Sequence, residues 1–295
     1  MIRPEWLRDV ERSLGVTRAH WTSVGHSDWA DRYAVATDDE RFFVKASSDR
    51  HASMLGAEAD GLRALRSTNA IRVPQVVAEL TVGGVSILVL EGLEFARARD
   101  GAGLGRALTG LHRATPQRGP NEERFGWSRD NWIGGTAQHN EWSDDWCTFW
   151  RDQRLAPQMA LAARHAFDGE FMRNGERLLG KLASLLRNHD PGPSLLHGDL
   201  WSGNAGTLLS GEAVIFDPAT YVGDREADIA MTELFGGFGA DFYAAYGEEW
   251  PLSSDYTVHR DVYNLYHVLN HLNLFGRSYL AQAERMVEQL LALAG

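Results

Sequence analysis

Three polar side chains in the C-terminal half of the sequence have the chemical types and the spacing that phosphoryl transfer requires. Asp199 and Asn204 lie five residues apart in one polar segment, and Asp217 follows Asn204 by thirteen residues. Transfer of a phosphoryl group from ATP needs a carboxylate to accept the proton of the attacking hydroxyl, and oxygen ligands to hold Mg²⁺ against the phosphates. Because carboxylate and amide oxygens suit Mg²⁺, we interpret Asp199 as the candidate base and Asn204 and Asp217 as candidate Mg²⁺ ligands.

The segments around this polar loop indicate how the three side chains could be brought together. The spacing from Asp199 to Asn204 equals that of the protein-kinase catalytic loop, and Asp217 stands where a kinase carries its metal-binding aspartate. Short apolar runs at residues 194–196 and 214–216 are predicted strands. A hairpin-like pairing of these two strands would bring Asp217 beside Asn204. A single Asp in a loop is usually a turn or cap residue, but the complete set favours catalysis.

The first 92 residues predict a small β-rich lobe. A helix is expected first, followed by three strands, a second helix and two further strands. The expected ranges are 4–14 and 50–66 for the helices, and 21–24, 31–36, 41–45, 75–80 and 85–90 for the strands. From about residue 93 the pattern is mostly helical. We therefore predict an α+β, bilobal, protein-kinase-like fold, with a nucleotide-binding N-lobe at residues 1–92 built on an antiparallel sheet and a larger, mostly helical C-lobe at residues 93–295.

Several residues of the predicted N-lobe could bind a nucleotide. Lys45 ends an apolar strand, so its ammonium group could reach the phosphates as a compact charge. Glu58 on the next helix could pair with Lys45 and fix its direction, although Lys and Glu are more often solvated surface charges. The segment that contains Leu88, Leu90 and Glu91 lies at the junction of the lobes, where backbone groups would meet adenine.

The segment between the first two predicted strands would cover the phosphates, and Gly25 and Ser27 are its candidate contacts. It contains one glycine, and neither a GxGxxG pattern nor a Walker lysine motif occurs there. These two residues are therefore assigned by their position in the predicted lobe.

The composition argues against several other classes of function. The 295 residues carry a formal net charge of −11 at pH 7, whereas binding to nucleic acid or to an anionic membrane requires basic patches. A single cysteine, Cys147, cannot form an internal disulfide, so a reducing compartment is expected. The first residues carry charges where a signal peptide would be apolar, and no apolar run reaches membrane-spanning length. We expect a cytoplasmic location.

On these residues the sequence closely resembles the fructosamine kinase (ketosamine kinase) family, which belongs to the kinase-like superfamily with aminoglycoside phosphotransferases and choline kinases. The loop from His197 to Asn204 indicates the superfamily, whereas Trp201 and the Gly-Asp-Arg-Glu stretch from Gly223 indicate this family. The resemblance spans nearly the whole chain, and its other segments are residues 104–112, 125–127, 131–134, 141–146, 217–219, 221–228, 234–238 and 272–276.

The resemblance implies ATP-dependent phosphorylation of a ketoamine, a sugar joined through its first carbon to an amine, at the third-carbon hydroxyl. The sugar would be that of a fructosamine or a ribulosamine, and the amine would be a small molecule or a lysine of a glycated protein. The product would break down and release the amine, a deglycation-type repair. Asp199 would be the base, Asn204 and Asp217 the Mg²⁺ ligands, and Lys45 with Glu58 the group that holds the phosphates.

Trp201, next to the base in sequence, would stack on the apolar face of the sugar under this resemblance. A buried core position is the rival interpretation, because aromatic residues usually contribute by packing.

Two features depart from the family pattern. Family members commonly carry paired glycines in the phosphate-covering loop, where this chain has only Gly25. Some relatives carry a cysteine in that loop for redox-linked dimerisation. This chain has none there, so we predict no such switch and favour a monomer.

Four further polar residues have a supporting interpretation. Asp228 resembles the aspartate that ties the catalytic loop to a C-lobe helix in kinase-like folds, and His197 would hold the same loop through a backbone hydrogen bond. Asp224 and Glu226 could face the cationic amine of the substrate, or could serve a turn and a helix start.

His267 and His271 have the i, i+4 spacing of a metal-binding pair. No Glu follows His267, and apolar residues at helical spacing surround both histidines, so we favour a packed helix over a zinc site.

Two alternatives to a ketoamine kinase stay open at this point. One is a phosphotransferase for another small hydroxyl compound, such as an aminoglycoside or choline. The other is a catalytically silent kinase fold that binds nucleotide or a partner, although such a module has no need of a complete set of phosphoryl-transfer residues.

Overall fold

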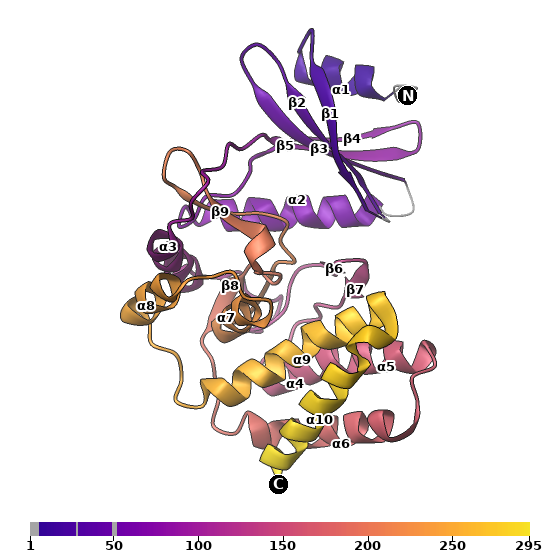
Figure 1. Ribbon diagram of the computed structural model, residues 1–295, viewed down its shortest axis with the longest axis vertical. Helices are drawn as coiled ribbons and strands as arrows, with labels where there is room; N and C mark the ends of the chain where they lie inside the picture. Colours follow the sequence, from indigo (N-terminus) through magenta and orange to yellow (C-terminus); the bar gives the residue numbers. More distant parts are fainter. Residues whose placement is uncertain (1–5, 28, 49–51) are drawn as a thin grey trace.

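The computed structural model describes residues 6–27, 29–48 and 52–295, with a sheet-containing upper part and a helical lower part (Figure 1). The upper part is built on a five-stranded antiparallel sheet with strand order β1-β2-β3-β5-β4. Its elements are α1 (Leu7–Leu14), β1 (His20–His26), β2 (Asp31–Ala36), β3 (Arg41–Ser48), α2 (Ala52–Ser67), β4 (Val76–Val82) and β5 (Val85–Glu91). The predicted order of helices and strands is confirmed, and β1 and β3 are longer than predicted. The predicted starts of the two helices, at residues 4 and 50, lie outside the described residues.

Alternation of side chains along β5 gives the sheet two buried faces. Ile87 and Val89 pack with α1 in one hydrophobic cluster, whereas Leu88 and Leu90 join a second cluster that includes α2. The two helices lie on opposite faces of the sheet in Figure 1. This second cluster continues into the lower part of the molecule, so α2 is packed between the sheet and the C-lobe.

The lower part is mostly helical, as predicted. Its helices are α3 (Gly101–Arg113), α4 (Trp146–Trp150), α5 (Ala156–Arg164), α6 (Gly169–Leu185), α7 (Arg225–Leu234), α8 (Ala240–Glu249), α9 (Tyr256–Phe275) and α10 (Leu280–Ala294). Six short strands form three two-stranded ladders: β6 (Asn131–Ile133) with β7 (Thr136–Gln138), β8 (Pro193–Leu196) with β11 (Tyr221–Asp224), and β9 (Ala205–Thr207) with β10 (Ala213–Ile215). Among the described residues, no helix is both long and apolar enough to cross a membrane.

The predicted pairing of the two strands around the catalytic loop is wrong. The first strand, β8, pairs with β11, and the second strand, β10, pairs with β9, which begins directly after Asn204. The sequence of β9 is Ala-Gly-Thr, which lacks the bulky alternation that predicts a strand. The outcome for the site is the one expected, because the backbone N–H of Phe216 bonds to the Asn204 carbonyl oxygen at 3.0 Å and so brings Asp217 beside Asn204.

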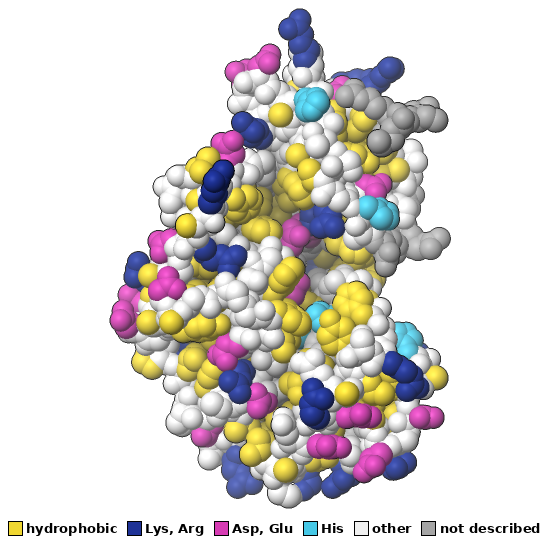
Figure 2. Space-filling model, in the orientation of Figure 1, with side chains coloured by type: hydrophobic (Ala, Val, Ile, Leu, Met, Phe, Trp, Pro, Cys, Tyr) yellow, Lys and Arg dark blue, Asp and Glu magenta, His cyan; other side chains and the backbone are white. Residues whose placement is uncertain are grey.

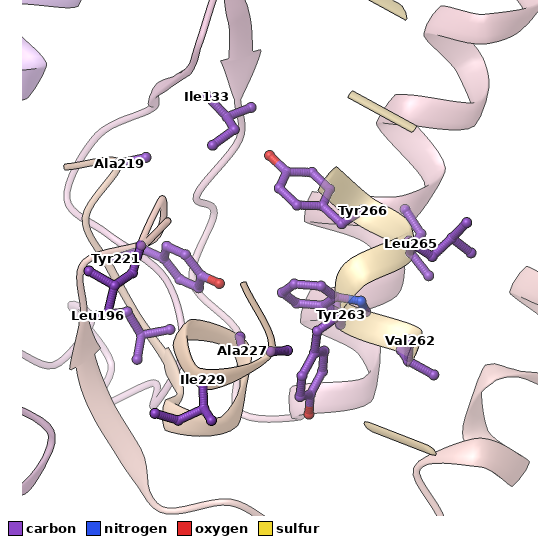
Figure 3. Close-up of a cluster of buried hydrophobic side chains, with 14 of the residues drawn as sticks. Ile133, Leu196, Ala219, Tyr221, Ala227, Ile229, Val262, Tyr263, Leu265 and Tyr266 are labelled. Atoms are coloured by element: carbon purple, nitrogen blue, oxygen red, sulfur yellow. The ribbon is translucent and has the colours of Figure 1, made fainter. Parts of the chain in front are cut away.

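The core of the lower part joins α9 to the elements that carry the catalytic loop. Figure 3 shows Tyr263 and Tyr266 of α9 facing side chains of β8, β11 and α7, among them Tyr221. His267 lies in the same helix, and burial together with the neighbouring His271 lowers its pKa to about 3, so its ring is neutral. The preference for a packed helix over a zinc site agrees with this burial.

Candidate active site

One buried carboxylate fixes the catalytic loop to α7. Asp228 accepts hydrogen bonds from the backbone N–H groups of His197 at 2.7 Å and Gly198 at 2.8 Å. Burial opposes the negative charge, but hydrogen bonds from His112 and from the loop outweigh it and lower the pKa of Asp228. Gly198 has φ +81°, and a Cβ there would lie 2.1 Å from the Ala219 carbonyl oxygen, so only glycine fits. The loop is therefore held by both charge and close packing.

His197 joins the catalytic loop to the residue before Asp217. Its Nε2 lies 2.9 Å from the Phe216 carbonyl oxygen, and its Nδ1 accepts from the Asp199 backbone N–H at 3.2 Å. This pair of bonds requires a neutral ring with its proton on Nε2, and burial lowers the pKa of His197. His197 and Asp228 thus lie where a supporting role in the loop would place them.

Asp199, Asn204 and Asp217 lie close together in the structure. The Nδ2 group of Asn204 donates to the Asp199 carbonyl oxygen at 2.9 Å, and it lies 3.3 Å from Oδ2 of Asp199 and 3.4 Å from the Asp217 carbonyl oxygen. Because the amide nitrogen is used in this way, Oδ1 of Asn204 is left to bind a cation. Asp217 has φ +57°, a left-handed conformation that aspartate tolerates and that recurs at functional sites.

Lys45 connects the two lobes through a buried ion network. Its Nζ donates to both carboxylate oxygens of Glu58, at 2.7 and 2.8 Å, and to Oδ1 of Asp217 at 2.9 Å. Burial disfavours the ammonium charge, but the two carboxylates outweigh this effect and raise the pKa of Lys45. Burial also opposes the charge of Asp217, and Lys45 outweighs it and lowers the pKa of Asp217. The predicted Lys45–Glu58 pair is formed, and Lys45 also bonds directly to Asp217, the candidate metal ligand.

Asp199, the candidate base, ionises close to neutral pH. Burial, followed by the negative charges of Asp217 and Asp228, raises the pKa of Asp199 to about 7, against a smaller opposing effect from Asn204. A carboxyl group with such a pKa can both accept a proton and release it at neutral pH, as general base catalysis requires.

Two adjacent cavities open between the upper and lower parts, where Figure 2 shows a hollow with charged side chains in it. The larger, of about 670 Å³, lies against β1, β2 and residues 90–95. The smaller, of about 210 Å³, is lined by Lys45 and Asp199 and by the β6–β7 hairpin. Asn204, Asp217 and Trp201 line both cavities, so the candidate chemical groups stand at their boundary.

The lobe junction agrees only partly with the predicted adenine contacts. Leu90 and Glu91 line the larger cavity, whereas Leu88 does not and is fully buried in the core. The backbone N–H of Glu91 is bonded to the Gln75 carbonyl oxygen at 2.9 Å. Leu93, which was not predicted, lines the cavity, and within the described residues its backbone N–H has no hydrogen-bond acceptor. We therefore correct Leu88 and place the open backbone donor at Leu93.

Gly25 and Ser27 line neither cavity in this structure, so their predicted phosphate contacts stay a prediction. The backbone N–H of Ser27 donates to the Ala30 carbonyl oxygen at 2.9 Å, and the Ser27 hydroxyl accepts from the Ala30 N–H at 3.2 Å. Both groups of Ser27 are thus used within the β1–β2 turn. Gly25 lies within β1 against the Arg32 side chain.

Trp201 is exposed at the boundary of the two cavities, with 41% of its surface accessible. Its ring lies over Gly203, where a Cβ would come within 2.2 Å of the indole. The rival interpretation of Trp201 as a core residue is therefore wrong, and the ring is available to a ligand.

Substrate contact by Asp224 and Glu226 is contradicted by their burial. Asp224 accepts hydrogen bonds from the Glu226 backbone N–H at 3.0 Å and from the Tyr263 hydroxyl at 2.6 Å, which makes it the N-cap of α7. Glu226 accepts from the Ser253 N–H at 2.7 Å and lies 2.9 Å from Nδ1 of His259. Both carboxylates are fully used inside the C-lobe, as the helix-start alternative predicted.

Several residues that line the cavities were missed by sequence reasoning. Phe95 and Phe216 meet edge to face, with ring centroids 5.5 Å apart, on the wall of the larger cavity. Trp29 and Trp132 line the smaller cavity. Phe216 precedes a candidate metal ligand, and Trp132 lies in a segment that resembles the family, so both could have been identified as site residues from the sequence. The sequence around Trp29 carried none.

Comparison with known proteins identifies the family to which this chain belongs. The sequence profile of the fructosamine kinase family matches residues 6–293. A probable ketoamine kinase of Synechocystis sp. is 44% identical over 263 residues, covering 88% of this chain and 86% of the relative. The chloroplastic protein-ribulosamine 3-kinase of Arabidopsis thaliana is 38% identical over 292 residues, covering 98% and 87%.

Solved structures share the fold over almost the whole chain. A Thermobifida fusca crystal structure assigned as a fructosamine-3-kinase superposes with a TM-score of 0.84 at 29% identity, covering 97% of this chain and 98% of its own. A thermostable mutant of the aminoglycoside phosphotransferase APH(4)-Ia superposes with a TM-score of 0.67 at 11% identity, covering 97% of both chains, which establishes a shared kinase-like fold. From the profile match and these relatives, the chain belongs to the fructosamine kinase family.

Proposed function

We propose that this protein transfers the γ-phosphoryl group of ATP to the third-carbon hydroxyl of a ketoamine. The observation that supports this most is that Asp199 and Lys45 line the smaller of two adjacent cavities, beside Asn204 and Asp217, which line both. The relatives named as a ketoamine kinase and a protein-ribulosamine 3-kinase support the same substrate class. The sugar is that of a fructosamine or ribulosamine, carried by a small amine or a protein lysine.

The larger cavity is the proposed nucleotide site. Its apolar wall of Leu90, Phe95 and Phe216 suits a purine, and the open N–H of Leu93 can donate to a ring nitrogen. Lys45 lines the smaller cavity and donates to Asp217, which lines both cavities, so its ammonium group is close enough to the larger cavity to bind the phosphates. In support, the fold relative APH(4)-Ia forms a ternary complex with AMP-PNP and hygromycin B.

The donor set at the boundary fits Mg²⁺. Asp217 gives Oδ1 to Lys45, and within the described residues its Oδ2 makes no hydrogen bond. We propose this oxygen and Oδ1 of Asn204 as the ligands, with phosphate oxygens and water completing the shell. Mg²⁺ bound there would neutralise charge on the phosphates and orient the γ-phosphoryl group.

The proposed reaction places the acceptor in the smaller cavity. The Asp199 carboxylate accepts the hydroxyl proton while the acceptor oxygen forms a bond to the γ-phosphorus and the bond to the β-phosphate oxygen breaks, releasing ADP. At about 210 Å³ this cavity is smaller than the proposed nucleotide cavity of about 670 Å³, which is consistent with a small acceptor in the smaller cavity.

The test is ATP-dependent ADP release with a fructosyl-lysine derivative, comparing the wild-type protein with Asp199→Asn. We expect kcat to fall by about 10²- to 10⁴-fold, because the proton acceptor is lost. Equal turnover by both proteins would remove Asp199 from this role.

A substrate panel separates ketoamine kinase from the alternatives. Ketoamines, aminoglycosides and choline are compared side by side at equal concentration. Turnover of an aminoglycoside or choline without any ketoamine would decide for another phosphotransferase. Nucleotide binding without turnover of any compound would decide for a catalytically silent fold.

A further inference from the structure

Three tryptophans line the small cavity that contains Asp199. They are Trp29, Trp132 and Trp201, and they come from three separate parts of the chain. All three are partly exposed, whereas Trp146 and Trp150 are buried in the core. Three tryptophans around a cavity of about 210 Å³ offer an incoming ligand aromatic surface.

Hydrogen bonds outside the cavity fix two of these tryptophans in place. Trp29 lies in the β1–β2 turn, and its carbonyl oxygen accepts a hydrogen bond from the buried Ser47 hydroxyl of β3. Trp132 lies in β6, next to Asn131, whose Nδ2 donates to the Thr220 carbonyl oxygen at 2.7 Å. The β6–β7 hairpin is thereby tied to the segment that follows Asp217.

Two of the three tryptophans at the cavity have indole N–H groups without an acceptor, although this alone does not separate them from core tryptophans, since the buried Trp150 Nε1 also lacks one among the described residues. In the core, Trp146 Nε1 donates to the Tyr263 hydroxyl at 2.9 Å, and Trp127 Nε1 lies 3.1 Å from Asp60 Oδ2. The Nε1 groups of Trp132 and Trp201 donate to no acceptor in the part of the chain that the structure describes. They are available to hydroxyl groups of a ligand.

One carboxylate of the small cavity has no cationic partner. The cavity is lined by Lys45, Glu58, Asp199 and Asp217, and Lys45 bonds to Glu58 and Asp217, which leaves Asp199 without an ion pair among the described residues. Trp29 already lies near one cation, since its ring centroid is 5.7 Å from Nζ of Lys45. Indole rings attract cations within about 6 Å of the centroid, and tryptophan does so most strongly.

The chemistry of the proposed substrate, on which this inference rests, puts its amine in the same cavity. Four bonds separate the third-carbon hydroxyl oxygen from the amine nitrogen, so the two atoms are at most about 5 Å apart at roughly 1.5 Å per bond. When the hydroxyl is at Asp199, the nitrogen must lie among groups that line this cavity. A secondary alkylamine is protonated at neutral pH, as a lysine amine is.

We propose that Trp29 and Trp132, together with Trp201, form an aromatic site that binds the protonated amine and the adjoining sugar carbons. This site makes Trp29 and Trp132 specificity-determining residues. It selects a ketoamine over the corresponding neutral ketose ether. The two tryptophans act on binding of the acceptor and leave the nucleotide site unchanged.

The experiment compares two acceptors that differ at one atom. One is a 1-alkylamino-1-deoxyfructose, and the other is the matching 1-O-alkylfructose, which carries no charge. The variants are Trp29→Leu and Trp132→Leu, with Trp29→Phe and Trp132→Phe as versions that keep an aromatic face. Trp21→Leu is the matched control, because Trp21 packs with Trp6 and Tyr33 on the α1 side of the sheet.

We expect each Leu variant to lose about 2- to 30-fold in kcat/KM for the amine, the range that a cation–π contact supplies. The ether should change by less than about 2-fold, and the Phe variants should retain most of the preference for the amine. The KM for ATP should not change in any variant. The control should keep the wild-type preference. Thermal unfolding of each variant identifies any loss of fold, and the Phe pair supplies the test if a Leu variant does not fold.

Two results would overturn the proposals separately. Equal losses for amine and ether, or no loss for either, would refute the aromatic site while leaving the ketoamine kinase activity intact. Wild-type protein that phosphorylates neither this amine nor any other ketoamine would refute the proposed function itself.

Discussion

Asp228→Asn should separate the support of the catalytic loop from the chemistry of the loop. In the wild-type protein the two carboxylate oxygens accept from the backbone N–H groups of His197 and Gly198, at 2.7 and 2.8 Å. Asparagine offers one oxygen and one NH₂ group, so one backbone N–H is left facing a donor. A buried unsatisfied N–H costs about 1–3 kcal/mol, and loss of charge on the remaining bond costs about 1 kcal/mol more.

We therefore expect Asp228→Asn to lower the free energy of unfolding by about 2–4 kcal/mol, measured by urea denaturation. The matched control is Asp152→Asn, whose carboxylate is partly exposed and paired with Arg151, and which should lose at most about 1 kcal/mol.

The kinetic effect of Asp228→Asn follows from the displacement of the loop. A shift of about 1 Å at the base can cost about 10²-fold, so kcat should fall by this order while the KM for ATP changes little. The charge of Asp228 also helps to raise the pKa of Asp199, so the acidic limb of the kcat profile should move to lower pH. Wild-type stability and kcat in Asp228→Asn would refute the assignment of Asp228 as the support of the loop.

Three further outcomes are expected. Lys45→Met should raise the KM for ATP and lower kcat in initial-rate measurements, because the phosphates lose a bound cation, and an unchanged KM would contradict this assignment. Gly198→Ala should lower stability in urea denaturation, because its Cβ would lie 2.1 Å from the Ala219 oxygen at a positive φ, whereas a neutral effect would show that the loop is not tightly packed. Burial opposes protonation of His189, but the hydrogen bond and charge of Asp224 outweigh it and raise the pKa above 6.5. His189→Gln should therefore destabilise the protein fully below about pH 6.5 and progressively less as pH rises through the folded-state pKa, and a pH-independent loss in urea denaturation would contradict this.

Much of the fold could be predicted because it follows from local pattern. The β4–β5 hairpin is an example, since Gly83 and Gly84 supply the two positive φ values, +57° and +78°, that a tight two-residue turn requires. The strand β9 could not be found in this way, since Ala205, Gly206 and Thr207 pair with β10 through backbone bonds and carry no strand pattern. Its pairing is set by the tertiary position of the catalytic loop.

In the site, too, residues close in sequence could be predicted, whereas residues placed by distant contacts could not. Asp199, Asn204 and Asp217 were accessible because their spacing in sequence reflects a short connection in space. Asp224 stayed open between substrate contact and a helix start, because an acidic residue near the loop does not reveal its burial, which depends on distant partners such as Tyr263. Trp29 was missed for the same reason, since its place in the cavity depends on a hydrogen bond from Ser47 to its carbonyl oxygen.

The proposed role of Asp199, Asn204 and Asp217 is to catalyse phosphorylation of a ketoamine by ATP. Phosphorus and carbon NMR of a fructosyl-amine incubated with ATP, Mg²⁺ and either wild-type protein or Asp199→Asn tests this role. We expect one product with phosphate on the third-carbon oxygen, formed by the wild-type protein and nearly absent with the variant. The absence of any phosphorylated ketoamine with the wild-type protein, or equal product with the variant, would contradict it.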